Sequence, residues 1–154
     1  KLILDEIGQW INLNKEAIFA SKPWKIYGDN LFSYLKREDG DGNVTDLEAL
    51  KKQKQSEQFN ERTIESEPYG HDEVRFTTKE DTLYIFLMNP REGRIELTSL
   101  GLKSNFSVNR IKSIKLIGGK SKVEFNHDEE KLNLTVPEER PNEYVAVFEV
   151  AGVL

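Results

Sequence analysis

The second half of the chain alternates apolar and polar residues over short runs, and this pattern limits the folds open to it. Between His71 and Leu154 seven runs carry apolar side chains at spacings that suit β-strands. They centre on 74–78, 82–88, 95–97, 114–116, 123–125, 132–136 and 144–148. The run 82–88 is continuously apolar, which predicts a central strand covered on both faces.

The links between these runs are short and rich in turn residues. Lys79–Asp81, Gly118–Gly119 and Asn126–Glu129 are each plausible hairpin turns, so consecutive strands are expected to pair antiparallel. No helical crossover interrupts the series. We therefore predict a mainly β fold, an antiparallel β-sandwich of about 7–8 strands over residues 72–154, preceded by one amphipathic α-helix.

The helix is predicted from apolar spacing near the N-terminus. Four side chains between Leu2 and Asn14 fall on one helix face, namely Ile3, Ile7, Trp10 and Ile11. No capping residue precedes the helix, and Asn14 is expected to end it in a left-handed conformation. The apolar face packs either on the sheet downstream or on another domain. From Pro23 to residue 28 the chain is expected to form a connector or a short strand.

The middle of the chain contains few large apolar side chains. We predict that residues 29–71 form a linker with a mobile charged insertion, because such a segment buries too little to offset its ordering entropy. The run Asp39–Asn43 begins like a calcium loop, but Val44 and Leu50 replace the Gly and Glu that such a loop requires. No metal site is predicted there.

Composition excludes several classes of function. The net charge of −5 and scattered Lys and Arg residues argue against a nucleic-acid partner, and no apolar run is long enough to span a membrane. The chain has no Cys, and its two His residues, His71 and His127, are expected to be exposed turn residues. No nucleophile, phosphate-binding or dinucleotide-binding motif is present, so no catalytic, cofactor or metal residue is assigned.

Several motifs occur in the order seen in one known family. The stretch Ile7-Gly-Gln-Trp-Ile-Asn-Leu-Asn-Lys-Glu-Ala-Ile-Phe19 resembles the end of the catalytic barrel of bacterial and animal α-L-fucosidases. The blocks 74–79 and 81–84 are similar to the opening of that family's C-terminal β-sandwich, and 114–118, 132–137 and 144–148 resemble its later strands. Lys15 and Phe19 depart from the family's usual Gly and Tyr.

The resemblance implies that the parent protein is a retaining exo-glycosidase that hydrolyses terminal α-L-fucosyl linkages, with its nucleophile and acid/base on a (β/α)₈ barrel upstream of Lys1. The implied partners are that barrel, in the same polypeptide, and fucosylated glycans for the parent. Ile3, Ile7, Trp10 and Ile11 would then face the barrel. The residues do not indicate a compartment, and an extracytoplasmic location is expected from the family alone. The chain opens on Lys1 rather than Met, so we expect a fragment or a processed product. We expect it to be inactive by itself, because the resemblance places the catalytic residues upstream.

Two other functions remain open at this point. A free-standing carbohydrate-binding module would use exposed aromatic side chains as platforms for sugar rings. The candidates for this role are Trp24, Tyr34, Tyr69 and Phe106. A purely structural interaction domain without a ligand is the third possibility.

Overall fold

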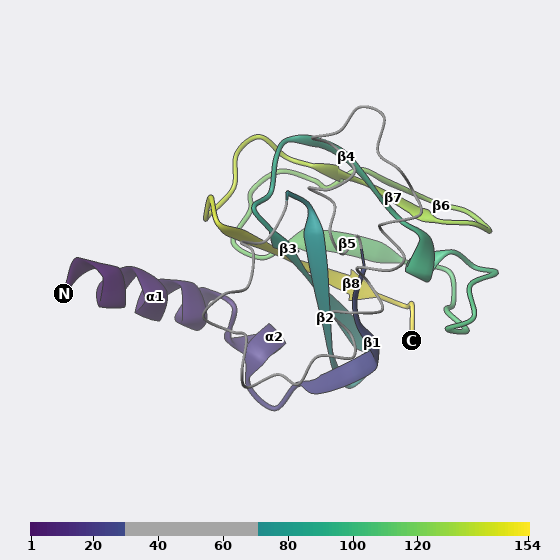
Figure 1. The fold of residues 1–154 in the computed structure, drawn as a ribbon, viewed down its shortest axis with the longest axis horizontal. Helices are drawn as coiled ribbons and strands as arrows, with labels where there is room; N and C mark the ends of the chain where they lie inside the picture. Colours follow the sequence, from purple (N-terminus) through teal and green to yellow (C-terminus); the bar gives the residue numbers. More distant parts are fainter. Residues whose placement is uncertain (30–70) are drawn as a thin grey trace, which may run out of the picture.

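A computed structural model describes residues 1–29 and 71–154, which form two antiparallel β-sheets with a helical arm at the N-terminus (Figure 1). The predicted mobile insertion, the Asp39–Asn43 turn, Tyr34 and Tyr69 lie outside the described residues.

In the described ranges the elements follow the order helix, helix, then eight strands. The helices are α1 (Leu2–Leu13) and α2 (Lys15–Ile18), and a 3₁₀ turn, η1 (Thr98–Leu100), follows the fourth strand. The strands are β1 (Lys22–Asp29), β2 (Glu73–Lys79), β3 (Thr82–Met88), β4 (Gly93–Leu97), β5 (Ser113–Leu116), β6 (Phe125–His127), β7 (Leu132–Val136) and β8 (Val145–Ala151).

The strands divide into a five-stranded sheet and a three-stranded sheet. The larger has the order β1-β2-β3-β8-β5 and the smaller the order β4-β7-β6, with every neighbouring pair antiparallel. Six of the seven predicted runs coincide with strands, the run 123–125 shares only Phe125 with β6, and β1 adds a further strand. The predicted mainly β sandwich with an N-terminal helix is confirmed.

The core lies between the two sheets, because alternate side chains of each strand point inward. Ile85 of β3 is paired with Phe148 of β8, and both are fully buried. Leu132 and Leu134 of β7 belong to the same apolar cluster from the smaller sheet. The period-two pattern therefore buries one face of strands such as β3, β7 and β8 in this core.

A second, smaller apolar cluster covers the outer face of the larger sheet. It combines Tyr84 and Phe86 of β3 with Val147 of β8 and Ala17 of α2. Strand β3 is thus buried on both faces, as its continuously apolar sequence predicts. The Thr77 hydroxyl donates a hydrogen bond of 2.8 Å to the Ala17 carbonyl, which fixes α2 on this face.

Two local predictions about chain direction are wrong. Gly118 and Gly119 do not make a hairpin, because β5 belongs to the larger sheet and β6 to the smaller one, and the chain crosses between them. Asn14 is not left-handed: its φ is −101°, and its side-chain amide and backbone N–H both donate to the Trp10 carbonyl. These bonds allow the chain to pass directly from α1 into α2.

The prediction of two exposed His residues is correct for His71 and wrong for His127. His127 is only 7% exposed, and its ring lies between backbone groups of two other segments. The Ile111 N–H donates to Nδ1 at 3.1 Å, so the ring proton lies on Nε2 and is donated to the Leu100 carbonyl at 2.7 Å. Alternation along the short β6 strand turns this side chain inward.

Candidate functional site

Helix α1 extends away from the sandwich and is held at its C-terminal end (Figure 1). There the Trp10 ring packs on Phe86, with ring centroids 6.4 Å apart, and its Nε1–H donates to the Val145 carbonyl at 3.4 Å. Ile11 is partly buried beside it. Of the four side chains predicted to share one helix face, Trp10 thus contacts the larger sheet.

The N-terminal half of α1 carries apolar side chains that nothing in the described part of the chain covers. Ile3 is 71% exposed and Ile7 is 49% exposed, and Leu2 and Leu4 are more than two-thirds exposed. No side chain caps the start of the helix. Contiguous exposed apolar surface of this kind is typical of an interface.

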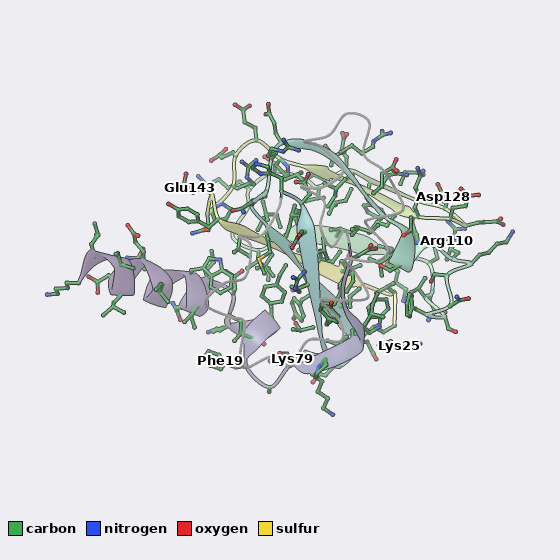
Figure 2. The ribbon with its side chains drawn as sticks, in the orientation of Figure 1. Phe19, Lys25, Lys79, Arg110, Asp128 and Glu143 are labelled. Carbon is green, nitrogen blue, oxygen red and sulfur yellow. The ribbon has the colours of Figure 1, made fainter. Side chains whose placement is uncertain are left out.

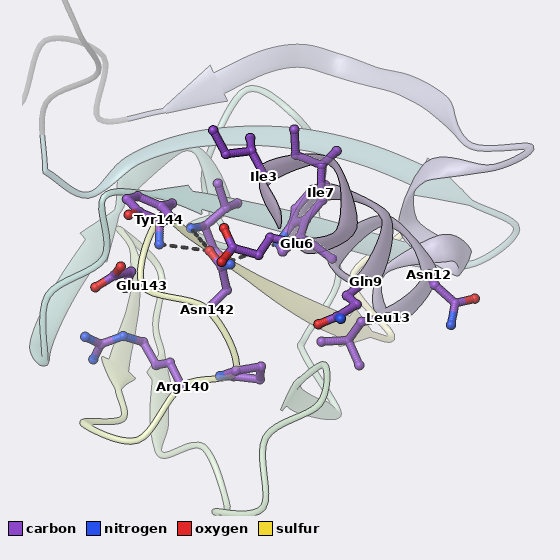
Figure 3. Close-up of a pocket in the computed structure, with 13 residues that line it drawn as sticks. Ile3, Glu6, Ile7, Gln9, Asn12, Leu13, Arg140, Asn142, Glu143 and Tyr144 are labelled. Atoms are coloured by element: carbon purple, nitrogen blue, oxygen red, sulfur yellow. Dashed lines mark hydrogen bonds between the residues drawn. The ribbon is translucent and has the colours of Figure 1, made fainter. Parts of the chain in front are cut away.

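A groove of about 1110 Å³ separates α1 from the loop that leads into β8 (Figure 3). Its helix wall consists of Ile3, Glu6, Ile7, Gln9, Trp10, Asn12 and Leu13, and its loop wall of Arg140, Pro141, Asn142, Glu143, Tyr144 and Val145. We call this feature the α1 groove. It is the candidate functional site because it adjoins the exposed apolar face.

Asn142 shapes the loop wall of the α1 groove. Its side-chain oxygen accepts hydrogen bonds from the backbone N–H groups of Tyr144 at 2.8 Å and Val145 at 2.9 Å (Figure 3). The bonds form an Asx-type turn that directs the Tyr144 ring outward. On the same loop, Arg140 donates through Nη1 to the Pro137 carbonyl at 2.5 Å.

Acidic side chains stand on both walls of the groove. A hydrogen bond from the Tyr144 hydroxyl to Glu143, together with the negative charges of Glu143 and Glu6, raises the pKa of Tyr144. Glu6 comes from α1 and Glu143 from the facing loop, so both walls contribute negative charge. The arrangement suits recognition of an apolar surface that carries a positive charge.

The described ranges 1–29 and 71–154 contain no group of three or more His, Cys, Asp or Glu side chains that could hold a metal ion. Among the same residues no helix is long and apolar enough to cross a membrane.

Two of the four predicted sugar-contacting aromatics lie together, on a different part of the molecule from the α1 groove. The Trp24 ring of β1 is 5.6 Å from the Phe106 ring and 5.0 Å from the Phe76 ring, measured between centroids. Lys25 donates from Nζ to the Phe106 carbonyl at 2.5 Å. Both Trp24 and Phe106 are partly buried against the core, so aromatic neighbours already occupy much of the Trp24 surface.

The sequence predicts Ile3, Ile7 and Trp10 of the helix wall but no residue of the loop wall. Tyr144 was included only as the start of a strand, whereas it precedes β8 and is exposed. The available signal was Pro141-Asn142, a dipeptide typical of turns, directly before an apolar strand. It predicts a turn but does not indicate which distant helix the turn faces.

Comparison with known proteins places these features in context. A family model described as "Alpha-L-fucosidase C-terminal domain" matches residues 68–150, more than half of the chain. No curated protein sequence matches the chain significantly. The structure of Thermotoga maritima alpha-fucosidase superposes with a TM-score of 0.57 at 15% identity, covering 94% of this chain and 25% of that one.

A second solved structure gives the same result. Alpha-L-fucosidase isoenzyme 1 from Paenibacillus thiaminolyticus superposes with a TM-score of 0.56 at 16% identity, over 99% of this chain and 26% of the other. At these identities the likeness establishes the fold. The chain spans about a quarter of the length of the solved structures it matches.

Proposed function

Because the chain belongs to the alpha-L-fucosidase C-terminal domain family, we propose that it is the non-catalytic C-terminal part of a glycoside hydrolase that removes terminal α-L-fucosyl groups. In this proposal the active site lies in a preceding catalytic barrel of the same polypeptide. The sandwich supports that barrel, and fucosylated glycans are substrates of the whole enzyme.

The observation that carries the proposal is the exposed apolar face of α1. Leaving large apolar side chains in water is unfavourable by about 1.5–3 kcal/mol for each one that a partner would bury fully. Ile3 and Ile7 are exposed beside a groove, directly upstream of a domain that belongs to a family of C-terminal domains. Docking of a preceding barrel on this face would bury both side chains.

The proposal predicts that activity requires the upstream polypeptide. The 154-residue chain and the longer polypeptide encoded by the same reading frame should be purified in parallel and assayed with an aryl α-L-fucoside. We expect the longer polypeptide to release the aryl alcohol and the 154-residue chain to release none above buffer, because the proposal places the nucleophile and the acid/base on the preceding barrel.

Activity of the chain alone would contradict the proposal, and so would a longer polypeptide that cleaves no aryl α-L-fucoside. A mock preparation from expression cells that lack the chain, purified in the same way, serves as the contamination control. Activity that is equal in the mock preparation comes from a contaminant.

The alternative of a free-standing carbohydrate-binding module stays a prediction for Trp24 and Phe106. Sugar stacking requires an open aromatic face, and the contacts of Trp24 with Phe76 and Phe106 reduce the face available. The proposal as a supporting domain needs no such platform and is therefore preferred.

A further inference from the structure

We propose that the α1 groove receives an apolar surface of the preceding catalytic domain that presents a Lys or Arg side chain to Glu6 and Glu143. This inference rests on the proposed function and adds the chemistry of the partner surface. It concerns specificity, since the apolar face alone would accept any apolar surface.

Exposed apolar side chains stand on both walls of the α1 groove. Ile3 and Ile7 stand on the helix wall and are exposed, and Tyr144 stands on the loop wall and is 64% exposed. Figure 3 shows the two walls facing each other with Glu6 extending from the helix toward Asn142. A partner element inserted between them would contact both walls and cover these side chains together.

Titratable side chains that line the groove determine which charge a partner can present to it. These are Glu6, Glu143, Tyr144 and Arg140. Arg140 is partly exposed and donates to the neutral Pro137 carbonyl, and Glu143 and Glu6 are both exposed. The two carboxylates therefore outnumber the single guanidinium. Glu138 and Glu139 on the same loop are exposed but do not line the groove.

Two carboxylates on opposite walls disfavour a third negative group and favour a positive one between them. An apolar partner surface bearing Asp or Glu would be repelled, and a neutral one would leave both carboxylates partly desolvated without compensation. A Lys or Arg side chain surrounded by apolar neighbours fits both walls. The preceding domain therefore presents a cationic group to the groove.

The test is a double charge reversal in the longer polypeptide. Glu6→Lys with Glu143→Lys should be compared with the matched control Glu138→Lys with Glu139→Lys, which makes the same change in net charge outside the groove. The readout is hydroxyl-radical modification of the Ile3 and Ile7 side chains, measured by mass spectrometry at low and high ionic strength.

We expect the groove variant to raise the modification rate of Ile3 and Ile7 by about tenfold at low salt. This is the change that follows when the equilibrium constant for docking falls by about tenfold. The control variant should change it less than about twofold. Unfolding of the 154-residue chain with the same groove substitutions should be unchanged, because both side chains are exposed.

The outcomes separate the two proposals. If Ile3 and Ile7 are not protected in the unmodified longer polypeptide, the proposed function fails. If they are protected and the groove variant behaves like the control, only the inference about the cationic group fails. Protection that depends on protein concentration would show that a second copy occupies the groove, and this too would overturn the inference.

Discussion

Replacing Phe148 with alanine is expected to destabilise the chain by about 3–5 kcal/mol. Phe148 is fully buried in β8, where it is paired with Ile85 on one side and with Leu116 on the other. Truncation would leave a cavity at the centre of the larger sheet, where neighbouring strands restrict relaxation. Urea unfolding followed by tryptophan fluorescence measures the loss.

Phe19→Ala is the matched control for this substitution. Phe19 is the same residue type but is 59% exposed and lies at the surface beside α2 (Figure 2). We expect its replacement to change the free energy of unfolding by less than about 0.5 kcal/mol. Equal losses for the two variants would contradict the assignment of the core.

His127→Ala is expected to cost about 2–4 kcal/mol, although the position reads as a polar turn in the sequence. The ring accepts from the Ile111 N–H and donates to the Leu100 carbonyl, and both partner residues are buried. Removing the ring leaves two buried backbone groups without these bonds, each worth about 1–3 kcal/mol. The free energy of unfolding in urea at neutral pH measures the effect.

The control for His127 is His71→Ala, which removes the other imidazole of the chain. His71 is exposed and contacts the Asn89 carbonyl through Nδ1 at 3.0 Å, so we expect a loss below about 1 kcal/mol. Arg110 and Asp128 flank His127 at the end of the sandwich far from α1 (Figure 2). If His127→Ala proved as mild as His71→Ala, the bridging role of the buried ring would be wrong.

Local patterning was sufficient to predict the strands. The continuous apolar run from Thr82 to Met88 became a strand buried on both faces, because one face meets the core and the other meets Ala17 and Trp10. Alternation over Leu132–Val136 correctly indicated a strand with one face in the core. Periodicity reports the environment of each strand, and this information is local.

Sheet membership could not be predicted in the same way, since it depends on contacts between distant segments. Strands β5 and β6 follow each other in the chain but lie in different sheets, and β8 inserts between β3 and β5. Gly118, with φ +75°, turns the chain near Leu13 and Pro141 rather than closing a hairpin. A glycine pair indicates a turn without specifying which strands it joins.

Only the helix wall of the candidate site could be predicted from the sequence, because the loop wall also depends on contacts between distant segments. Apolar spacing over Ile3, Ile7 and Trp10 identified the helix face, but the sequence left open whether the face packs on the sheet or elsewhere. The structure divides it: Trp10 contacts Phe86, while Ile3 and Ile7 remain exposed. The loop wall, with Asn142 and Tyr144, lies more than 120 positions away in the sequence, and no short-range pattern links it to α1.

In the proposed function, the apolar face of α1 docks on a preceding catalytic domain. Hydroxyl-radical footprinting of Ile3 and Ile7 in the 154-residue chain and in the longer polypeptide tests it most directly. We expect fast modification in the chain alone, where both side chains are exposed, and at least about tenfold slower modification in the longer polypeptide. Equal rates in the two proteins would contradict it.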